Sequence, residues 1–322
     1  MSRRQAGRPC AEPERISGMI GAVTVSGEAP RQAPRAPERA GTIAVVIPCF
    51  NDGPTLLDAV GSARTQERID ELVVVDDGST DAETLARFKS LEAEGVQVVH
   101  RSNGGLGAAR MSGVAATTSE YIFCLDADDR LLPGALEALA SALDRSPELS
   151  LAWGDYRLFG DRSWRQHTAP SLDGWQITYQ NDLPASLLIR RSALMRVGGW
   201  ELSGGYEDWD LLMALAERGS RGARVPIVAY EYRQHGVRML AESATRHADI
   251  YALLQRRHPR LFADRRRHWR RSSAPWALKL ALPLIFALPI GANRRRLLAG
   301  AACHLAGGRG LAQLMRRARA GV

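Results

Sequence analysis

The sequence predicts an α/β fold in which a mostly parallel central sheet is flanked by helices on both faces. Short apolar runs alternate along residues 42–132 with segments of helical spacing, and this alternation is typical of parallel sheets. Polar residues follow the carboxyl ends of the runs, which is where open α/β sheets bind ligands. The chain of 322 residues, 45% of them hydrophobic, is long enough for one such domain with extensions.

The strands and helices of this first half are expected in strict alternation. Each expected strand is a short apolar run, and each expected helix places apolar residues at helical spacing. In order along the chain, the segments are strand Ile43–Pro48, helix Thr55–Thr65, strand Glu71–Asp76, helix Asp81–Glu94, strand Val96–His100, helix Gly107–Ala116 and strand Tyr121–Leu125. Such a Rossmann-like half collects the polar residues after its strands in one crevice.

The pattern is less regular after Pro133. A helix is expected at Gly134–Leu143 and strands at Leu151–Tyr156 and Ile227–Tyr232, with Trp, Gly and Pro in the loops between them. No internal repeat is present.

The chain therefore divides into three parts. Its first segment is rich in Pro, Arg, Gly and Ala without periodicity, which is typical of disorder. We expect a disordered leader over 1–41, a catalytic domain over 42–255 and a basic, apolar C-terminal extension over 256–322. Within the catalytic domain, 42–132 is the expected nucleotide-binding half and 133–255 the acceptor half.

Charge is distributed unevenly along the chain. From Arg256 onward there are 16 Lys or Arg residues and a single acid, whereas the rest of the chain has 34 acids and 27 bases. Residues 276–290, WALKLALPLIFALPI, are fewer than the about 20 that a transmembrane helix needs. Their arginine-rich flanks favour a helical segment that lies on an anionic membrane surface. A soluble helical appendage is the alternative, and the apolar content argues against nucleic acid as the partner.

The cysteines indicate a reducing compartment. Cys10, Cys49, Cys124 and Cys303 are widely separated and show neither a C-x-x-C pair nor a zinc-type spacing with histidine. The N-terminal residues lack the continuous apolar stretch of a signal peptide. We expect a cytoplasmic protein that can attach peripherally to the inner face of the cell membrane through its tail.

The most informative motif is Asp126-Ala127-Asp128-Asp129, at the end of an apolar run. Carboxylates clustered at a buried strand end repel one another and need a compensating cation. Mg²⁺ or Mn²⁺ fits, because one or two carboxylates commonly hold such an ion while substrate phosphates supply further oxygens. The motif thus predicts a divalent metal and a nucleoside-diphosphate substrate, with a solvated loop as the alternative.

Two more motifs follow neighbouring strands. Asp76-Asp77-Gly78-Ser79-Thr80 has two carboxylates that can accept hydrogen bonds from a base or a ribose, although Ser79 or Thr80 could instead cap the next helix. In 103–110, NGGLGAAR, the glycines permit close backbone approach, and the helix start with Arg110 can offset diphosphate charge. A dinucleotide fingerprint is excluded, because Arg110 occupies its third glycine position.

Five motifs in this order resemble those of family 2 glycosyltransferases of the GT-A fold. They are Ile47-Pro48-Cys49-Phe50-Asn51, Asp76-Asp77-Gly78-Ser79, Asn103 to Arg110, Asp126 to Asp129, and Gly205-Tyr206-Glu207-Asp208-Trp209-Asp210. The resemblance spans about residues 42–240. It implies an inverting, hexosyltransferase-like enzyme with a nucleotide-sugar donor and a divalent metal, Mg²⁺ or Mn²⁺.

The resemblance also implies roles for individual residues. Phe50, where the family often has tyrosine, would pack near the base, and Asp76 or Asp77 would contact base and ribose. Asp126 would reach the ribose side, and Asp128 would hold the metal. The residues expected around the nucleotide sugar are Pro48, Phe50, Asn51, Asp76, Asp77, Asn103, Gly104, Arg110, Asp126, Ala127 and Glu207.

The acceptor side is expected at Glu207-Asp208. Inversion needs a base on the sugar face opposite the leaving diphosphate, positioned to take the proton of the acceptor hydroxyl. The resemblance assigns this role to Asp208 and leaves Asp210 structural. The alternative is an exposed helix start, where acids are favoured by the helix dipole.

Other candidates are single residues. His235 resembles the histidine of the family's Tyr-Arg-x-His element and is expected near the metal or the diphosphate, although Val237-Arg238-Met239 replaces the customary serines. Trp153, Trp175 and Trp200 could stack on sugar rings, but packing in the core or in loops is the expectation for each.

The sequence therefore predicts transfer of a sugar to a hydroxyl of a glycan or lipid-linked acceptor, in cell-envelope or surface polysaccharide or glycolipid synthesis. Two alternatives are kept. A metal-dependent nucleotidyltransferase would also use carboxylates and Mg²⁺, but has no need of the Glu207-Asp208 loop. A catalytically inactive nucleotide- or carbohydrate-binding protein would need no base.

Overall fold

The computed structural model describes residues 41–160, 163–234 and 245–306. All of them belong to one compact unit, Arg39–Val322. The second unit of the chain, Met1–Glu38, lies outside the described residues, and so does the expected leader apart from Gly41.

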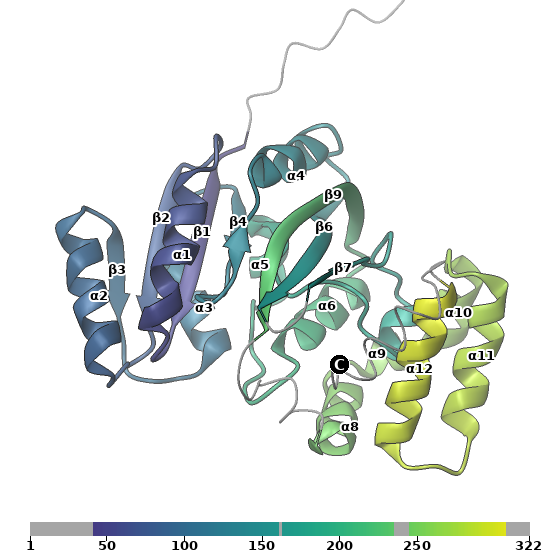
Figure 1. The fold of residues 1–322 in the computed structure, drawn as a ribbon. Helices are drawn as coiled ribbons and strands as arrows, with labels where there is room; N and C mark the ends of the chain where they lie inside the picture. Colours follow the sequence, from purple (N-terminus) through teal and green to yellow (C-terminus); the bar gives the residue numbers. More distant parts are fainter. Residues whose placement is uncertain (1–40, 161–162, 235–244, 307–322) are drawn as a thin grey trace, which may run out of the picture. The chain divides into compact units, whose positions relative to one another are not determined.

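The strands in the described ranges form one mixed sheet of nine (Figure 1). Their order is β3-β2-β1-β4-β8-β6-β9-β5, and β7 pairs with β6 outside this path. The strands are β1 Ile43–Cys49, β2 Glu71–Asp76, β3 Gln97–His100, β4 Tyr121–Cys124, β5 Arg130–Leu131, β6 Leu149–Gly160, β7 Trp164–Gln166, β8 Leu188–Arg190 and β9 Arg221–Gln234.

The first four strands are parallel, as expected for this half of the chain, and β1, β2 and β4 are buried or half-buried, whereas β3 is exposed at both ends. β1 pairs with β2 on one side and with β4 on the other, with Cys49 opposite Asp76 and Val46 opposite Cys124. The strand order reverses between β1 and β4, and open α/β sheets bind ligands at such a point. The turns after β1, β2 and β4 therefore meet at one edge of the sheet.

The second half of the sheet is not parallel throughout. β8 pairs antiparallel with both β4 and β6, and β5 pairs antiparallel with β9, whereas β6 and β9 are parallel to each other. The expectation of a mostly parallel sheet thus describes the nucleotide-binding half, and the acceptor half makes the whole sheet mixed.

Helices cover both faces of the sheet. The apolar residues of α1 (Gly53–Arg64), α2 (Ala82–Ala93) and α4 (Ala135–Asp144) pack in one core cluster. Those of α3 (Leu106–Ala115), α5 (Arg191–Arg196), α6 (Glu207–Glu217) and α8 (His247–Arg257) pack in a second cluster on the other face. The cap of α2 is Asp81, whose carboxylate accepts the N–H of Thr84 at 2.8 Å, so neither Ser79 nor Thr80 has that role.

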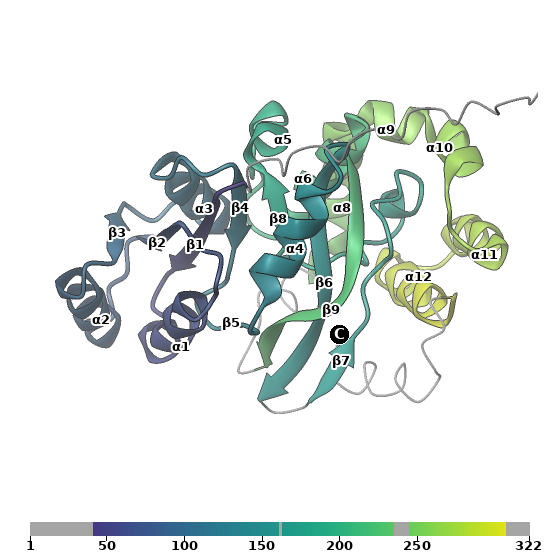
Figure 2. The ribbon, with the colours of Figure 1, turned by 90° about the horizontal axis from the view of Figure 1, so that it is seen from above.

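The C-terminal residues form further helices that pack on the acceptor half (Figure 2). They are α9 Pro259–Ala263, α10 Arg265–Arg271, α11 Trp276–Ala287 and α12 Ala292–Ala306. Leu278 and Leu282 of α11 are buried against Trp175 and Tyr179 of the acceptor half. None of the helices in the described ranges combines the length and the apolar character needed to cross a lipid bilayer.

Candidate active site

The turn after β1 is tied to the turn after β2 by the side chain of Asn51. Asn51 has a left-handed φ of 57°, and its Oδ1 accepts the N–H groups of Thr80 at 2.9 Å and Asp81 at 3.0 Å. Its own N–H donates to Ser79 Oγ at 3.1 Å. Phe50 is the side chain that this turn presents to solvent, with 46% of its surface exposed, whereas Pro48 is buried in β1.

The two acids at the end of β2, Asp76 and Asp77, are buried and already bonded within the chain. Asp76 accepts the N–H of Ser79 at 2.7 Å and contacts His100 Nδ1 at 3.0 Å. The contact with Asp76 is the main cause that raises the pKa of His100. Asp76 therefore anchors the end of β3 as well as its own turn.

Asp77 supports the glycine-rich loop. Its Oδ1 accepts Arg101 Nη1 at 2.8 Å and the N–H of Gly104 at 3.0 Å, and its Oδ2 accepts the N–H of Gly105 at 2.8 Å. Gly78 allows this close approach, because its φ is +76° and a Cβ there would lie 2.6 Å from the backbone nitrogen of Asn103. Asn103 and Gly104 are exposed just before the first turn of α3, where a helix start favours an anion.

The Asp126-Ala127-Asp128-Asp129 turn follows β4 and is held from two sides. Asp126 Oδ1 accepts Arg110 Nη2 of α3 at 2.7 Å, and Ala127 is buried. Arg233 of β9 donates its N–H to Asp129 Oδ1 at 2.9 Å and its Nε to the Asp128 carbonyl at 2.8 Å. Asp126 and Asp128 are partly exposed, whereas Asp129 is buried.

The turn carries negative charge that the described residues do not fully compensate. The carboxyl of Asp129 is 1% exposed, and its Oδ2 has no hydrogen-bond partner among them. Burial, together with the charges of Asp128 and Asp126, raises the pKa of Asp129 well above its ordinary value. A divalent cation beside Asp128 fits this arrangement.

No group of three or more His, Cys, Asp or Glu side chains in the described ranges is arranged to hold a metal. An ion bound to a diphosphate needs fewer protein ligands, because one or two carboxylates suffice when the substrate supplies the remaining oxygens. Asp128 is the carboxylate that the sequence predicts for this role. His235, the second expected ligand, lies outside the described residues.

Arg110 connects the donor motifs to the expected base. Its guanidinium is 2% exposed, bonds Asp126, and lies 5.5 Å from the ring centre of Trp200. Its charge also acts on Asp208, whose pKa it lowers against the larger effect of burial, which raises that pKa. Arg110 thus bonds Asp126, and its charge favours the ionised form of Asp208, which belongs to a distant motif.

Asp208 stands in the first turn of α6. Tyr206 before it has a left-handed φ of 61°, and Glu207 Oε1 accepts the N–H of Gly205 at 2.8 Å. Asp208 Oδ2 accepts Asn181 Nδ2 at 2.9 Å. Asp208 is partly buried, so the exposed helix start considered as an alternative does not describe it, while Glu207 is engaged in shaping the turn.

The third acid of this motif has a different environment. Asp210 is 2% exposed and binds Arg257 Nε at 2.7 Å and His258 Nε2 at 2.8 Å. It joins α6 to the end of α8. This is the structural position that the sequence suggested.

The tryptophans considered as sugar platforms are packing residues. Trp153 and Trp175 are 0% and 1% exposed, and Trp200 is 7% exposed against Arg110. The sequence did not predict that Asn181 contacts Asp208 or that Trp200 contacts Arg110. Nothing in the local sequence marks Asn181, because its partner Asp208 is distant along the chain.

Comparison with known proteins shows which proteins this part of the chain is similar to. Residues 44–200 match the family model described as glycosyl transferase family 2. A pre-mycofactocin glycosyltransferase of Mycobacterium tuberculosis is 31% identical over 208 residues, which cover 59% of this chain and 43% of that protein. An uncharacterized glycosyltransferase, EpsJ, of Bacillus subtilis is 25% identical over 45% of this chain and 42% of its own length. The chain thus spans less than half the length of these curated relatives.

A solved structure shows the same fold. TarS 1–349 of S. aureus, in complex with UDP-GlcNAc, superposes with a TM-score of 0.57 at 17% sequence identity, covering 87% of this chain and 88% of that one. The mixed sheet with flanking helices is therefore a GT-A fold.

Proposed function

We propose, because this chain belongs to glycosyltransferase family 2, that it moves a sugar from a nucleoside-diphosphate sugar to an acceptor hydroxyl with inversion at the anomeric carbon. The observation that carries the proposal is the position of Arg110, which bonds Asp126 of the donor motif at 2.7 Å and also acts on the charge of Asp208. The family match favours this interpretation over a nucleotidyltransferase.

In the proposed reaction, Asp208 is the general base. It accepts the proton of the acceptor hydroxyl while that oxygen forms a bond to the anomeric carbon. The bond from this carbon to the diphosphate breaks, and its electron pair leaves with the diphosphate. Burial raises the pKa of Asp208 and so strengthens it as a base, while Arg110 and Asn181 favour its charged form.

The donor would lie over the turns after β1, β2 and β4. Phe50 is exposed and suited to pack against the base, while Asn51 and Asp77 hold the surrounding turns in place. The start of α3 faces the diphosphate in this arrangement, and Asp128 would hold the divalent metal. When bound, such an ion supplies positive charge that stabilises the departing diphosphate.

The setting we propose is assembly of a cell-envelope or surface polysaccharide or a glycolipid at the cytoplasmic face of the membrane. The C-terminal helices support it, since they carry an excess of arginine and several exposed apolar side chains. A peripheral attachment would bring the site close to lipid-linked acceptors.

The first test is nucleotide binding. UDP, GDP and dTDP are titrated into wild type and Asp128→Ala, each with Mn²⁺ and with EDTA, and followed by calorimetry. We expect one nucleotide to bind in a metal-dependent manner and the variant to lose that dependence. Asp249→Ala, which removes an exposed acid from the first turn of α8, is the matched control. Absence of binding by every nucleotide in wild type contradicts the proposal.

The second test concerns the base. Asp208→Asn keeps the shape of the side chain and removes its basicity, so kcat should fall by about 10²- to 10⁴-fold, the usual contribution of a general base. Affinity for the donor nucleotide should stay within about twofold of wild type. Equal turnover by wild type and Asp208→Asn would show that Asp208 is not the general base.

A further inference from the structure

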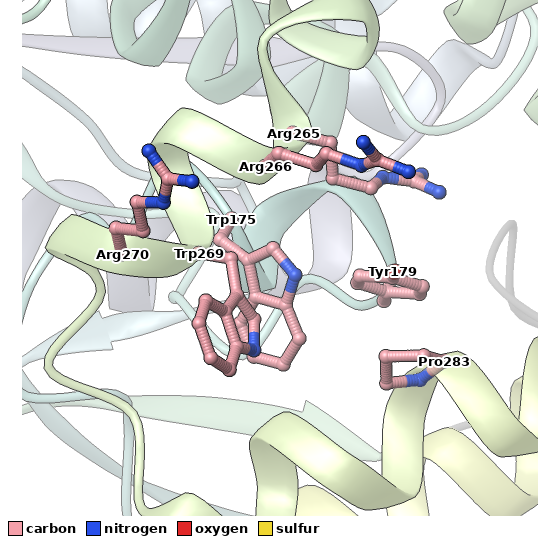
Figure 3. A pocket seen from close by; sticks show the side chains of 7 residues that line it. All are labelled: Trp175, Tyr179, Arg265, Arg266, Trp269, Arg270 and Pro283. Atoms are coloured by element: carbon pink, nitrogen blue, oxygen red, sulfur yellow. The ribbon is translucent and has the colours of Figure 1, made fainter.

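A pocket of about 440 Å³ lies between α10, α11 and the segment around η1 (Gln176–Thr178). Its walls include Trp175 and Tyr179 of the acceptor half, Trp269 of α10 and Pro283 of α11. Figure 3 shows Arg265 and Arg266 reaching over Tyr179, and Arg270 apart from them beyond the tryptophans. The volume is within the range of small-molecule sites. None of these residues belongs to the donor motifs or to the Glu207-Asp208 turn.

The aromatic side of this pocket is fixed by the fold. Trp175 is 1% exposed, and its ring lies edge-on to that of Tyr179 with 5.2 Å between ring centres. Arg265 donates its Nε to Thr178 Oγ1 at 3.0 Å and lies 4.2 Å from the ring centre of Tyr179. Arg265 is therefore used to hold the wall, and the pocket is formed before a ligand arrives.

Two other arginines of the pocket do not hold its wall in the way that Arg265 does. Arg266 and Arg270 are exposed, one helical turn apart on α10, and the structure gives neither an ion pair nor a hydrogen bond within the described residues. Like charges at this spacing weaken a helix slightly, and an anion bound near both arginines would relieve their repulsion. Guanidinium groups suit phosphate, which they can bind with two parallel hydrogen bonds.

The surface beside the pocket is apolar. Trp276, Leu280, Leu284 and Leu288 recur every fourth residue along α11 and its end, and their exposed fractions are 76%, 55%, 67% and 42%. The one charged side chain of α11, Lys279, turns back to donate to the Ser272 carbonyl at 2.7 Å. Pro283, which lines the pocket, precedes Leu284 on the same helix, so the pocket and this apolar face are neighbours on α11.

We propose that the pocket binds the phosphate group of a lipid, with the apolar chain of the lipid along the exposed face of α11. The phosphate would contact Arg266 and Arg270, whose positive charge it complements, and the first part of the chain would contact Trp269 and Pro283. Its ligand class is a phosphate ester of a long apolar alcohol or of a diacylglycerol.

This site deepens the proposed function, on which its role as an acceptor site rests. Tyr179 is two residues from Asn181, so their Cα atoms are at most about 7 Å apart. Asn181 in turn donates to the base Asp208 at 2.9 Å. A lipid phosphate held at this pocket therefore marks the side from which a lipid-linked acceptor would approach the base.

The test is calorimetric titration of the full chain with decyl phosphate below its micelle concentration, with decanol and with inorganic phosphate. We expect decyl phosphate to bind at least tenfold more tightly than either of the others. The double variant Arg266→Gln/Arg270→Gln should weaken decyl phosphate binding at least tenfold, and Arg145→Gln, an exposed arginine after α4, should leave it unchanged. Dioctanoyl phosphatidic acid is the second ligand, because tighter binding of the two-chain lipid indicates a bilayer phospholipid and tighter binding of decyl phosphate a single-chain carrier.

Three results would overturn the proposal: equal binding by the double variant and wild type, decanol binding as tight as decyl phosphate, or inorganic phosphate binding as tight as decyl phosphate. The same samples are titrated with the donor nucleotide to show that the variant is folded. Because lipid binding is measured without turnover, failure of this site and failure of the proposed transfer are separate outcomes.

Discussion

At the scale of single residues, the charge state of Asp208 depends on a small set of neighbours. Burial raises its pKa, Arg110 lowers it, and Glu207 raises it further. Asn181 donates to Oδ2, and a hydrogen bond to the charged form of a carboxylate favours that form. The amide of Asn181 thus positions the base and helps to keep it deprotonated.

Asn181→Ala is expected to change the pH dependence of the reaction. Without the donor, the pKa of Asp208 rises further, and the base is protonated over a wider acid range. The acid limb of kcat/KM should move to higher pH, and kcat at its optimum should fall about tenfold because the carboxylate loses a hydrogen bond to a charged group. The measurement is kcat/KM from pH 5 to pH 9.

Gln180→Ala is the control for this change, because the Gln180 side chain donates to the Asn181 carbonyl and not to Asp208. It should leave the acid limb in place. If Asn181→Ala has the profile of wild type, the contact with Asp208 has no effect on the base.

At the scale of elements, the nucleotide-binding half follows from the sequence and the acceptor half does so only in part. β2 has the expected bounds, and the other expected strands and helices of that half differ by one or two residues, because continuous apolar runs and helical spacing are local signals. β5 was not expected. β5 and β8 have two and three residues, too few for any periodicity, and their pairing with β9 and β4 is decided by long-range contacts.

The roles of individual residues in the candidate site could likewise be predicted only in part from the sequence. The motifs predicted which acids lie at the site. They did not predict which of these acids bind a ribose and which only stabilise a turn, because the same residue types do both. Asn51 and Asp77 form hydrogen bonds within the chain. Asn51 bonds Thr80 and Asp77 bonds Gly105, and these contacts are visible only in the structure. Arg110 was expected to face a diphosphate, and the structure places its guanidinium on Asp126.

The turn after β2 gives the prediction at this scale. Gly78→Ala should lower the free energy of unfolding by more than the about 1–3 kcal/mol typical of a strained backbone, because its Cβ would also lie 2.6 Å from Asn103 N. Gly95→Ala is the matched control, since Gly95 has a φ of +82° but no atom within 4 Å of a Cβ. Urea unfolding of both variants separates backbone strain from steric overlap, and equal losses would show that the Asn103 contact costs nothing.

At the scale of the whole molecule, an acidic catalytic part is joined to a basic C-terminal extension. The described part of the extension, up to Ala306, packs on the acceptor half through Leu278 and Leu282 and is therefore continuous with the fold. Its outward side chains on α11 are apolar, and Arg294, Arg295 and Arg296 begin the next helix. A helix with an apolar face and cationic ends is typical of attachment in the plane of a membrane interface.

Vesicle binding tests this attachment. The protein should sediment with vesicles that contain anionic lipid, bind less to zwitterionic vesicles, and dissociate as salt screens the arginines. Trp276→Ala/Leu284→Ala removes the two most exposed apolar side chains of α11, each able to contribute about 1.5–3 kcal/mol when buried, so binding should weaken at least about tenfold. Leu57→Ala/Leu85→Ala, which removes exposed leucines from α1 and α2, is the control. If both double variants bind alike, the apolar face of α11 does not enter the membrane, and the arginines alone would account for any attachment.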